Sequence, residues 1–238
     1  MDFLTDYVKL LARIADASIL LPVGVLLLRR KYIRGVAMRL LALFVLLTAA
    51  RNLITEILSA SRTPNIIYYN WFAILSYLNV AWLYYVLLKG KVRQFMIPVS
   101  CILLVGLSLL DSSTLFDSRT TVFNAYAHPL NGFFIIVLVL VFFVQLLESL
   151  QVPNIKQYTF FWFSAGALLY YTGTLLLYLF SRYTLSITGT TGWQNYFWSI
   201  DCLLSLLFNS FMAVSIWYAG QNHHFSEPIL PVRAGSLP

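Results

Sequence analysis

Seven apolar runs of roughly 20 residues each dominate this sequence and limit the folds that it can adopt. They cover residues 7–28, 36–58, 66–88, 95–110, 128–147, 158–180 and 193–220. A helix is the single-chain element that crosses hydrocarbon with its backbone hydrogen bonds satisfied inside the segment. The sequence therefore predicts an all-α, polytopic membrane protein. We expect a seven-transmembrane-helix bundle over residues 1–220 and a short disordered cytoplasmic tail over 221–238.

The composition supports a membrane protein and argues against nucleic-acid binding. Only 11% of the 238 residues are charged and 60% are hydrophobic, whereas soluble domains are about 25% charged. The formal net charge is +7, but the basic residues stand in short clusters between the apolar runs. No basic face of useful size is left for a nucleic acid. The expected partner of most of the surface is the lipid bilayer.

The same basic clusters predict the orientation of the chain. They occupy alternate connections, at 29–34, 89–93 and Lys156, while the remaining loops offer only Arg62, Arg119 and Arg182. Cytoplasmic loops carry the excess of lysine and arginine. We therefore expect the N-terminus outside and the C-terminus in the cytoplasm. The acidic N-terminal segment does not fit a signal peptide, so the first run is expected to be a retained helix.

The last apolar run contains a carboxylate that needs an explanation. Asp201 is followed by Ser205 and Asn209, and this spacing puts all three on one face of a helix. A carboxylate in hydrocarbon costs at least ~2.5–3.5 kcal/mol, so it should face the protein interior and have a partner. Arg51 and Asp16 are the candidates, because each lies roughly as deep in its own span, about 12–14 Å from the outer end. We expect Arg51 to pair with Asp16 or Asp201.

These groups belong to a wider set of polar residues in the predicted outer half of the spans, above an inner half that is nearly all apolar. The arrangement predicts a polar cavity that faces outward above an apolar floor. The expected ligand-binding residues are Asp16, Arg51, Asn52, Asn79, Tyr171, Asp201 and Ser205. The alternative is a structural ion-pair network that fixes the order of the helices without binding a ligand.

The sequence favours a protein without catalytic activity. The histidines, His128 and the pair His223 and His224, fall on opposite sides in the predicted topology, and the two cysteines form no CxxC pair. We therefore expect no metal site, and no motif suggests a cofactor or a catalytic nucleophile. Gly166 and Gly173 are expected to be positions of close helix packing.

Three stretches carry a resemblance to a known group of proteins. They are FWFSAGALLYYTGTLLLYLFSRY, FWSIDCLLSLLFNSFMAVSIWY and NLITEILSASRTPNIIYYNWFAILSYL. Together they resemble poorly characterised bacterial seven-helix membrane proteins, whose members occur alone or as the membrane sensor modules of histidine kinases. The resemblance implies a bacterial cytoplasmic (inner) membrane location. Because no kinase follows the seventh run, it also implies signalling through a separate cytoplasmic or membrane partner, such as a histidine kinase.

Several functions are compatible with this sequence pattern. We favour a membrane sensor or receptor-like module that binds a solute in the outward-facing cavity and signals to a separate partner. The alternatives are a small-solute transporter of three-plus-one-plus-three architecture, a membrane enzyme of unknown chemistry, and an assembly role. Transport usually leaves polar groups along both halves of the path. The apolar inner half of these spans therefore argues against transport.

Overall fold

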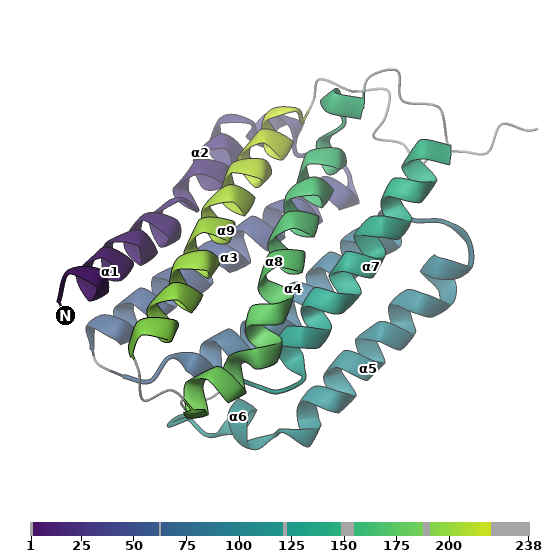
Figure 1. Cartoon of the computed structure of the whole chain (residues 1–238). Coiled ribbons are helices and arrows are strands. Elements are labelled where there is room, and N and C mark those ends of the chain that lie inside the picture. Colours follow the sequence, from purple (N-terminus) through teal and green to yellow (C-terminus); the bar gives the residue numbers. More distant parts are fainter. Residues whose placement is uncertain (1, 62, 121–122, 149–154, 188–190, 220–238) are drawn as a thin grey trace, which may run out of the picture.

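The computed structural model describes residues 2–61, 63–120, 123–148, 155–187 and 191–219. Its long helices lie side by side in one bundle (Figure 1). Among the described residues, seven helical segments are long and apolar enough to cross a membrane. The predicted fold class is confirmed: the chain is an all-α, polytopic seven-helix membrane protein.

The helices follow the predicted runs closely. They are α1 (Asp2–Ala17), α2 (Leu20–Leu28), α3 (Val36–Ala60), α4 (Ile66–Leu87), α5 (Ile97–Leu110), α6 (Ser113–Phe116), α7 (Ala127–Glu148), α8 (Thr159–Ile187) and α9 (Thr191–Trp217). Short helical turns, η1 (Arg30–Tyr32), η2 (Val92–Met96) and η3 (Ile155–Gln157), precede α3, α5 and α8. The expected tail at 221–238 lies outside the described residues.

The first span is broken, although the sequence predicts one helix over residues 7–28. α1 ends at Ala17 and α2 begins at Leu20, so residues 18 and 19 interrupt the helix. Proline has no N–H to donate, and its ring clashes with the carbonyl four residues earlier, which here belongs to Ser18. The break therefore falls at the carbonyl that Pro22 cannot bond.

The spans form a ring that α1 and α2 close. α9 packs against both α1 and α2, α8 lies between α9 and α7, and α4 lies between α7 and α3. α5 packs against α4 and α7 on the outside of this ring. We call the end of the bundle where α3 ends and α4 begins the cavity end. The other end, which carries Arg29, Arg30, Lys31, Lys89 and Lys91, is the basic end.

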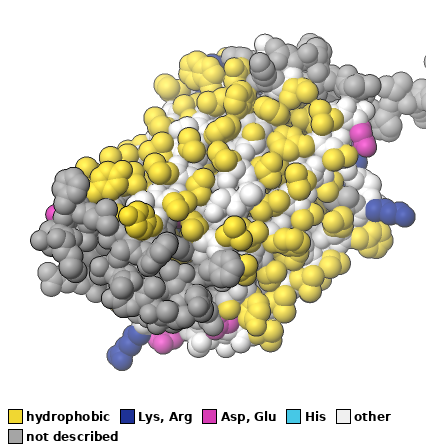
Figure 2. Space-filling model, in the orientation of Figure 1, with side chains coloured by type: hydrophobic (Ala, Val, Ile, Leu, Met, Phe, Trp, Pro, Cys, Tyr) yellow, Lys and Arg dark blue, Asp and Glu magenta, His cyan; other side chains and the backbone are white. Residues whose placement is uncertain are grey.

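The surface of the bundle suits a hydrocarbon environment. In Figure 2, hydrophobic side chains cover the side of the bundle, and the charged side chains visible on this face lie near its rim. Leu20, Leu28 and Ile102 are 67%, 77% and 72% exposed although each belongs to a span. Exposed leucine and isoleucine at these positions are stable in contact with lipid.

Two glycines let α8 and α9 approach closely. A Cβ built on Gly166 would lie 2.5 Å from the Cβ of Phe211, and one on Gly173 would lie 2.6 Å from Cδ1 of Leu204. Both distances are shorter than real side chains tolerate. The expectation that Gly166 and Gly173 are close-packing positions is confirmed, and it explains why α9 can hold its polar face against α8.

Candidate functional site

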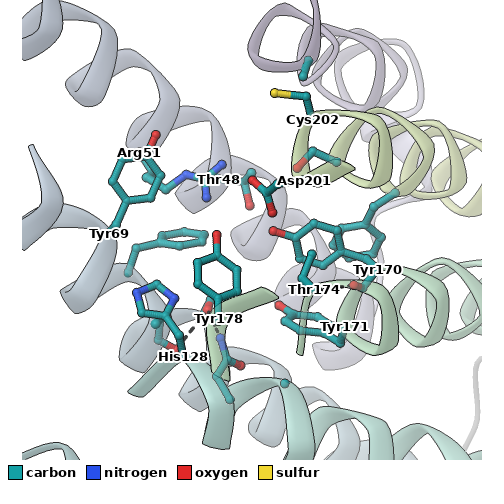
Figure 3. Close-up of a pocket in the computed structure, with 18 of the residues that line it drawn as sticks. Thr48, Arg51, Tyr69, His128, Tyr170, Tyr171, Thr174, Tyr178, Asp201 and Cys202 are labelled. Carbon is teal, nitrogen blue, oxygen red and sulfur yellow. Dashed lines mark hydrogen bonds between the residues drawn. The ribbon is translucent and has the colours of Figure 1, made fainter. Parts of the chain in front are cut away.

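A cavity of about 130 Å³ lies in the half of the bundle near the cavity end. Its walls come from α1, α3, α4, α7, α8 and α9, so six spans contribute to one site (Figure 3). Asp201, Ser205 and Asn209 all line it, as their spacing on one helical face predicts. Asp16 from α1 and Arg51 from α3 line the same space. One basic and two acidic side chains therefore share one cavity inside the bundle.

Arg51 is held against one wall by an amide rather than by a carboxylate. Its Nε and one Nη donate to Oδ1 of Asn52 at 3.0 and 2.6 Å. The guanidinium also lies over the rings of Tyr69 and Phe72, with its Cζ 5.2 and 4.7 Å from their centroids. Such stacking on aromatic faces stabilises a guanidinium that has left bulk water.

The prediction that Arg51 forms an ion pair with Asp16 or Asp201 is therefore wrong: its hydrogen bonds go to Asn52. Within the described part of the chain, the single carboxylate–cation pair within 4.0 Å is Asp6 with Lys9, at 3.6 Å on the surface of α1. Arg51 still attracts Asp16 and Asp201 electrostatically across the cavity. Depth in the membrane placed the three groups at one level. It could not determine which neighbour the guanidinium fork would bond.

Asp201 faces the cavity with one of its two carboxylate oxygens unbonded among the described residues. Its carboxylate accepts a hydrogen bond from the Tyr178 hydroxyl. Figure 3 places it beside the side chains of Tyr170 and Tyr178, with Arg51 on the other side of the space. Its Oδ1 is buried and has no hydrogen-bond partner among the described residues. A buried carboxylate oxygen of this kind is unusual and indicates a missing donor.

The break in the first span lies beside the cavity and is satisfied by side chains from other helices. Asn52, which holds Arg51, donates through Nδ2 to the Asp16 carbonyl at 3.2 Å. The Ser18 hydroxyl donates to the Ala15 carbonyl at 2.6 Å and accepts from Nδ2 of Asn209 at 2.7 Å. Irregular backbone at membrane depth is tolerated where it is buried in protein or lines a cavity. α3 and α9 therefore fix the broken helix at the level of the charged residues.

Six of the seven expected ligand-binding residues line the cavity, namely Asp16, Arg51, Asn52, Tyr171, Asp201 and Ser205. Asn79 is not among the lining residues. It lies in α4 with 6% of its surface exposed, and its amide has no hydrogen-bond partner in the described residues. Asn79 follows Asn70 by nine residues in α4 and therefore lies nearer the basic end. Whether the six residues bind a ligand stays a prediction.

The sequence did not predict that aromatic side chains form one wall of the cavity. Tyr69, Tyr170, Tyr178 and Trp198 line the cavity, and the Tyr170 hydroxyl bonds the side chain of Ser205. The tyrosines of these spans look like ordinary packing residues in the sequence. Their position at the depth of Arg51 and Asp201 was the available signal, because a buried tyrosine needs a partner for its hydroxyl.

The loop between α5 and α7 covers the cavity end. Phe123 is 2% exposed and its ring contacts those of His128, Tyr178, Trp198 and Tyr69, at centroid distances of 5.0, 5.4, 6.1 and 6.4 Å. All four of these rings line the cavity. Phe123 therefore forms an aromatic cap over the charged site.

A buried amide network holds that cap in place. Asn70 of α4 donates through Nδ2 to the Thr114 carbonyl at 2.9 Å and accepts at Oδ1 from the Asn124 backbone N–H at 3.0 Å. The Asn124 side chain in turn donates to the carbonyls of Ser108 and Asp111 and accepts from the N–H of Ala127. Because Asn124 follows Phe123 directly, these bonds fix the ring over the cavity.

An aromatic floor closes the cavity on the side of the basic end. Phe44 and Phe208 line its base, 5.9 Å apart between centroids, and Phe163 packs on both at 5.7 and 6.0 Å. Below this floor lie the fully buried Leu41 and Met212. Beyond it, the hydroxyls of Tyr84 and Ser164 bond each other at 2.8 Å.

Comparison with protein-family models, with curated proteins and with solved structures finds no match for this chain. The cavity itself indicates what size of solute it can hold. Its volume is below the roughly 300–1,000 Å³ of pockets that hold drug-sized ligands. It is close to the roughly 150 Å³ of an engineered cavity that takes up benzene. The site is therefore sized for a few waters or one small solute.

Proposed function

We propose that this protein is a membrane receptor module that binds one small solute in its charged cavity and reports the binding at the basic end. The observation that carries the proposal is a charged cavity with a closed aromatic floor. A solute can contact Asp201 and Arg51 there, whereas the Phe44, Phe163 and Phe208 rings block a path to the basic end. Binding without passage is what a sensor requires.

Two helices connect the site with the basic end. α9 carries Asp201 at the cavity and Trp217 at its last residue, about 24 Å away along the axis. α2 begins at the helix break beside the cavity and runs along α9. It is followed by Arg29, whose Cζ lies 4.4 Å from the centroid of the Trp217 ring.

This pair of helices suggests how binding is reported. A solute with different affinities for two packings of α2 against α9 would shift the population between them. In this proposal α2 pivots at the break at residues 18 and 19, while the bonds from Asn52 and Asn209 hold the end of α1 and Ser18 in place. The changed surface at the basic end would then be read by a separate partner, and a histidine kinase of a bacterial inner membrane fits the resemblance described above. In this proposal the cavity end faces outward, in agreement with the distribution of basic residues.

A second function is favoured by one observation. The interrupted span beside the charged cavity is a feature that many secondary transporters share. A small-solute transporter is therefore the competing proposal. It requires the aromatic floor to open in an alternate state, whereas the receptor requires it to stay closed.

The test uses the full chain in lipid nanodiscs and in liposomes. Spin labels would be placed on Leu28 and Leu147, which are 77% and 63% exposed at the basic end, after Cys101 and Cys202 are replaced by serine. The probes are propylammonium, 1-propanol, propionate and β-alanine, which share a short carbon chain and differ in charge. We expect one of them to raise the unfolding temperature and to change the distance between the labels.

Uptake of the same probe into liposomes separates the two functions. A receptor leaves the internal concentration of the stabilising probe at the level of protein-free liposomes. Uptake above that level would reject the receptor proposal and support the transporter. A stabilising probe that leaves the label distance unchanged would contradict the reporting role.

A further inference from the structure

The unused hydrogen-bonding groups of the cavity define the chemistry of its occupant. Asp201 Oδ1 and Asn131 Oδ1 are buried, and neither has a partner among the residues that the structure describes. Both side chains line the cavity, and Asn131 as a whole is 6% exposed. Both atoms are acceptors. The occupant that satisfies them must donate hydrogen bonds or carry positive charge.

The balance of charge leads to the same conclusion. The lining contains two carboxylates, Asp16 and Asp201, and one guanidinium, Arg51. When all three are ionised, the cavity holds one negative charge in excess. Arg51 makes no ion pair with Asp201 within 4.0 Å; its Nε and one Nη bond Asn52 instead, and its faces lie over Tyr69 and Phe72. A monovalent cation in the cavity would restore neutrality, and its attraction to Asp201 would offset the cost of removing it from water.

The walls around Asp201 fit an organic cation better than a metal ion. Tyr170 and Tyr178 lie beside Asp201 (Figure 3). Trp198 also lines the cavity, and aromatic rings attract ammonium groups. The described residues contain no cluster of three or more His, Cys, Asp or Glu side chains that could hold a metal ion. An ammonium group provides a positive charge, N–H donors and an apolar body that suits these rings.

We propose that the cavity binds a small organic monocation, a protonated amine of about six or fewer heavy atoms. Asp201 is its counter-ion and Asn131 is a second acceptor. The inference rests on the proposed function, because it names the chemical class of the solute that the receptor binds. Arg51 has a different role. Held in place by Asn52, it leaves one excess negative charge in the cavity and so limits the occupant to a single positive charge.

The test is equilibrium binding to the full chain in nanodiscs of uncharged lipid. The probes are propylammonium, 1-propanol, propionate and β-alanine, and sodium chloride is used at equal ionic strength. We expect propylammonium to bind, and the neutral, anionic and zwitterionic probes of the same length to bind far more weakly or not at all. Sodium chloride should not displace it beyond ordinary screening.

Two variants locate the bound cation. Asp201→Asn keeps the shape of the side chain and removes its charge, so the affinity for propylammonium should fall by about tenfold or more. The matched control is Asp6→Asn, an exposed carboxylate of α1, which should leave the affinity unchanged. If Asp201→Asn does not fold, Asn131→Ala is measured in its place. It should weaken propylammonium binding by several-fold.

The outcomes separate this inference from the proposed function. Preferential binding of propionate, 1-propanol or β-alanine, with a change in the distance between the labels at Leu28 and Leu147, would overturn the cation and keep the receptor. Equal stabilisation by sodium would overturn the organic cation. If propylammonium binds without any change in the label distance, the proposal of a bound cation stands and the proposal of a receptor is rejected. If none of the probes binds, the inference fails.

Discussion

Asn52 connects more of the site than any charged residue does. Its Oδ1 accepts two bonds from the Arg51 guanidinium, and its Nδ2 donates to the Asp16 carbonyl at the end of α1. One amide thus orients the Arg51 guanidinium and bonds the end of α1 to α3. The sequence placed Asn52 at the correct depth. It did not show this double role, because the partner on α1 is 36 residues away in the chain.

Replacing Asn52 by leucine should therefore destabilise the protein. The variant keeps the branching and the number of heavy atoms of the side chain, but it removes the acceptor of the guanidinium and the donor to the Asp16 carbonyl. We expect the free energy of unfolding to fall by about 1–3 kcal/mol, since buried polar groups lose their bonds. Reversible unfolding by detergent titration measures it. The control is Asn65→Leu, a half-buried residue in the turn before α4. An equal loss in both variants would contradict the role given to Asn52.

The comparison of Asn52 with Asn79 shows what the sequence could determine about the site. Distance along a span predicts depth, and it placed Asp16, Arg51 and Asp201 in one cavity. The direction in which a side chain points around the helix axis depends on how each helix is rotated in the bundle. Asn79 is buried but does not line the cavity. An apolar span has a weak amphipathic signal, so this rotation is hard to read from its sequence.

At the scale of the helices, the boundaries were predictable and the break was not. Basic clusters and turn residues end the apolar runs, and the helices end near them. Gly35 and Gly90, with φ of 82° and 71°, lie in two of these basic connections. The break after Ala17 depends on Asn52 of α3, which donates to the Asp16 carbonyl, and on Asn209 of α9, which donates to the Ser18 hydroxyl. Proline alone does not distinguish a kink from a break, because the outcome depends on such distant partners.

The contact between α8 and α9 offers a test at this scale. In Gly166→Ala the new methyl would lie 2.5 Å from the Cβ of Phe211, which is not a flexible chain end. We expect a loss of about 1–3 kcal/mol in the free energy of unfolding from overpacking. Gly106→Ala in α5 is the matched control, because nothing lies within 4 Å of its Cβ position. That change should be neutral or stabilising by at most ~1 kcal/mol.

The same contact supports the site, so the two glycine variants have different consequences for binding. α9 carries Asp201, and its distance from α8 sets the position of the carboxylate relative to Tyr170 and Tyr178. A shift of α9 in Gly166→Ala should therefore also weaken propylammonium binding. Gly106→Ala should leave it unchanged. If Gly106→Ala proved as harmful as Gly166→Ala, the close approach of α8 and α9 would not be the cause.

At the scale of the whole molecule, the fold class followed from the apolar runs alone, while orientation remains a prediction of loop charge. The residues with which we define the basic end, Arg29, Arg30, Lys31, Lys89 and Lys91, make it the expected cytoplasmic face. The direction from which a solute reaches the cavity depends on this orientation.

A reporter enzyme that is active only outside the cytoplasm tests the orientation. Fused after Pro238, it should be inactive, because the C-terminus is expected inside. Fused after Ser118 in a truncated chain, it should be active, since the loop between α5 and α7 lies at the cavity end. The opposite pattern of activity would invert the topology and place the cavity toward the cytoplasm.

If the cavity binds a solute as proposed, the Phe123 cap would set how fast the site responds. A solute that approaches past this loop meets a buried ring in contact with four rings of the cavity wall. Association then waits for the ring to move, and such loop motions are slower than diffusion to an open pocket. Departure waits for the same motion. A receptor built in this way averages the concentration of its solute over time and ignores fluctuations that are shorter than the opening of the cap.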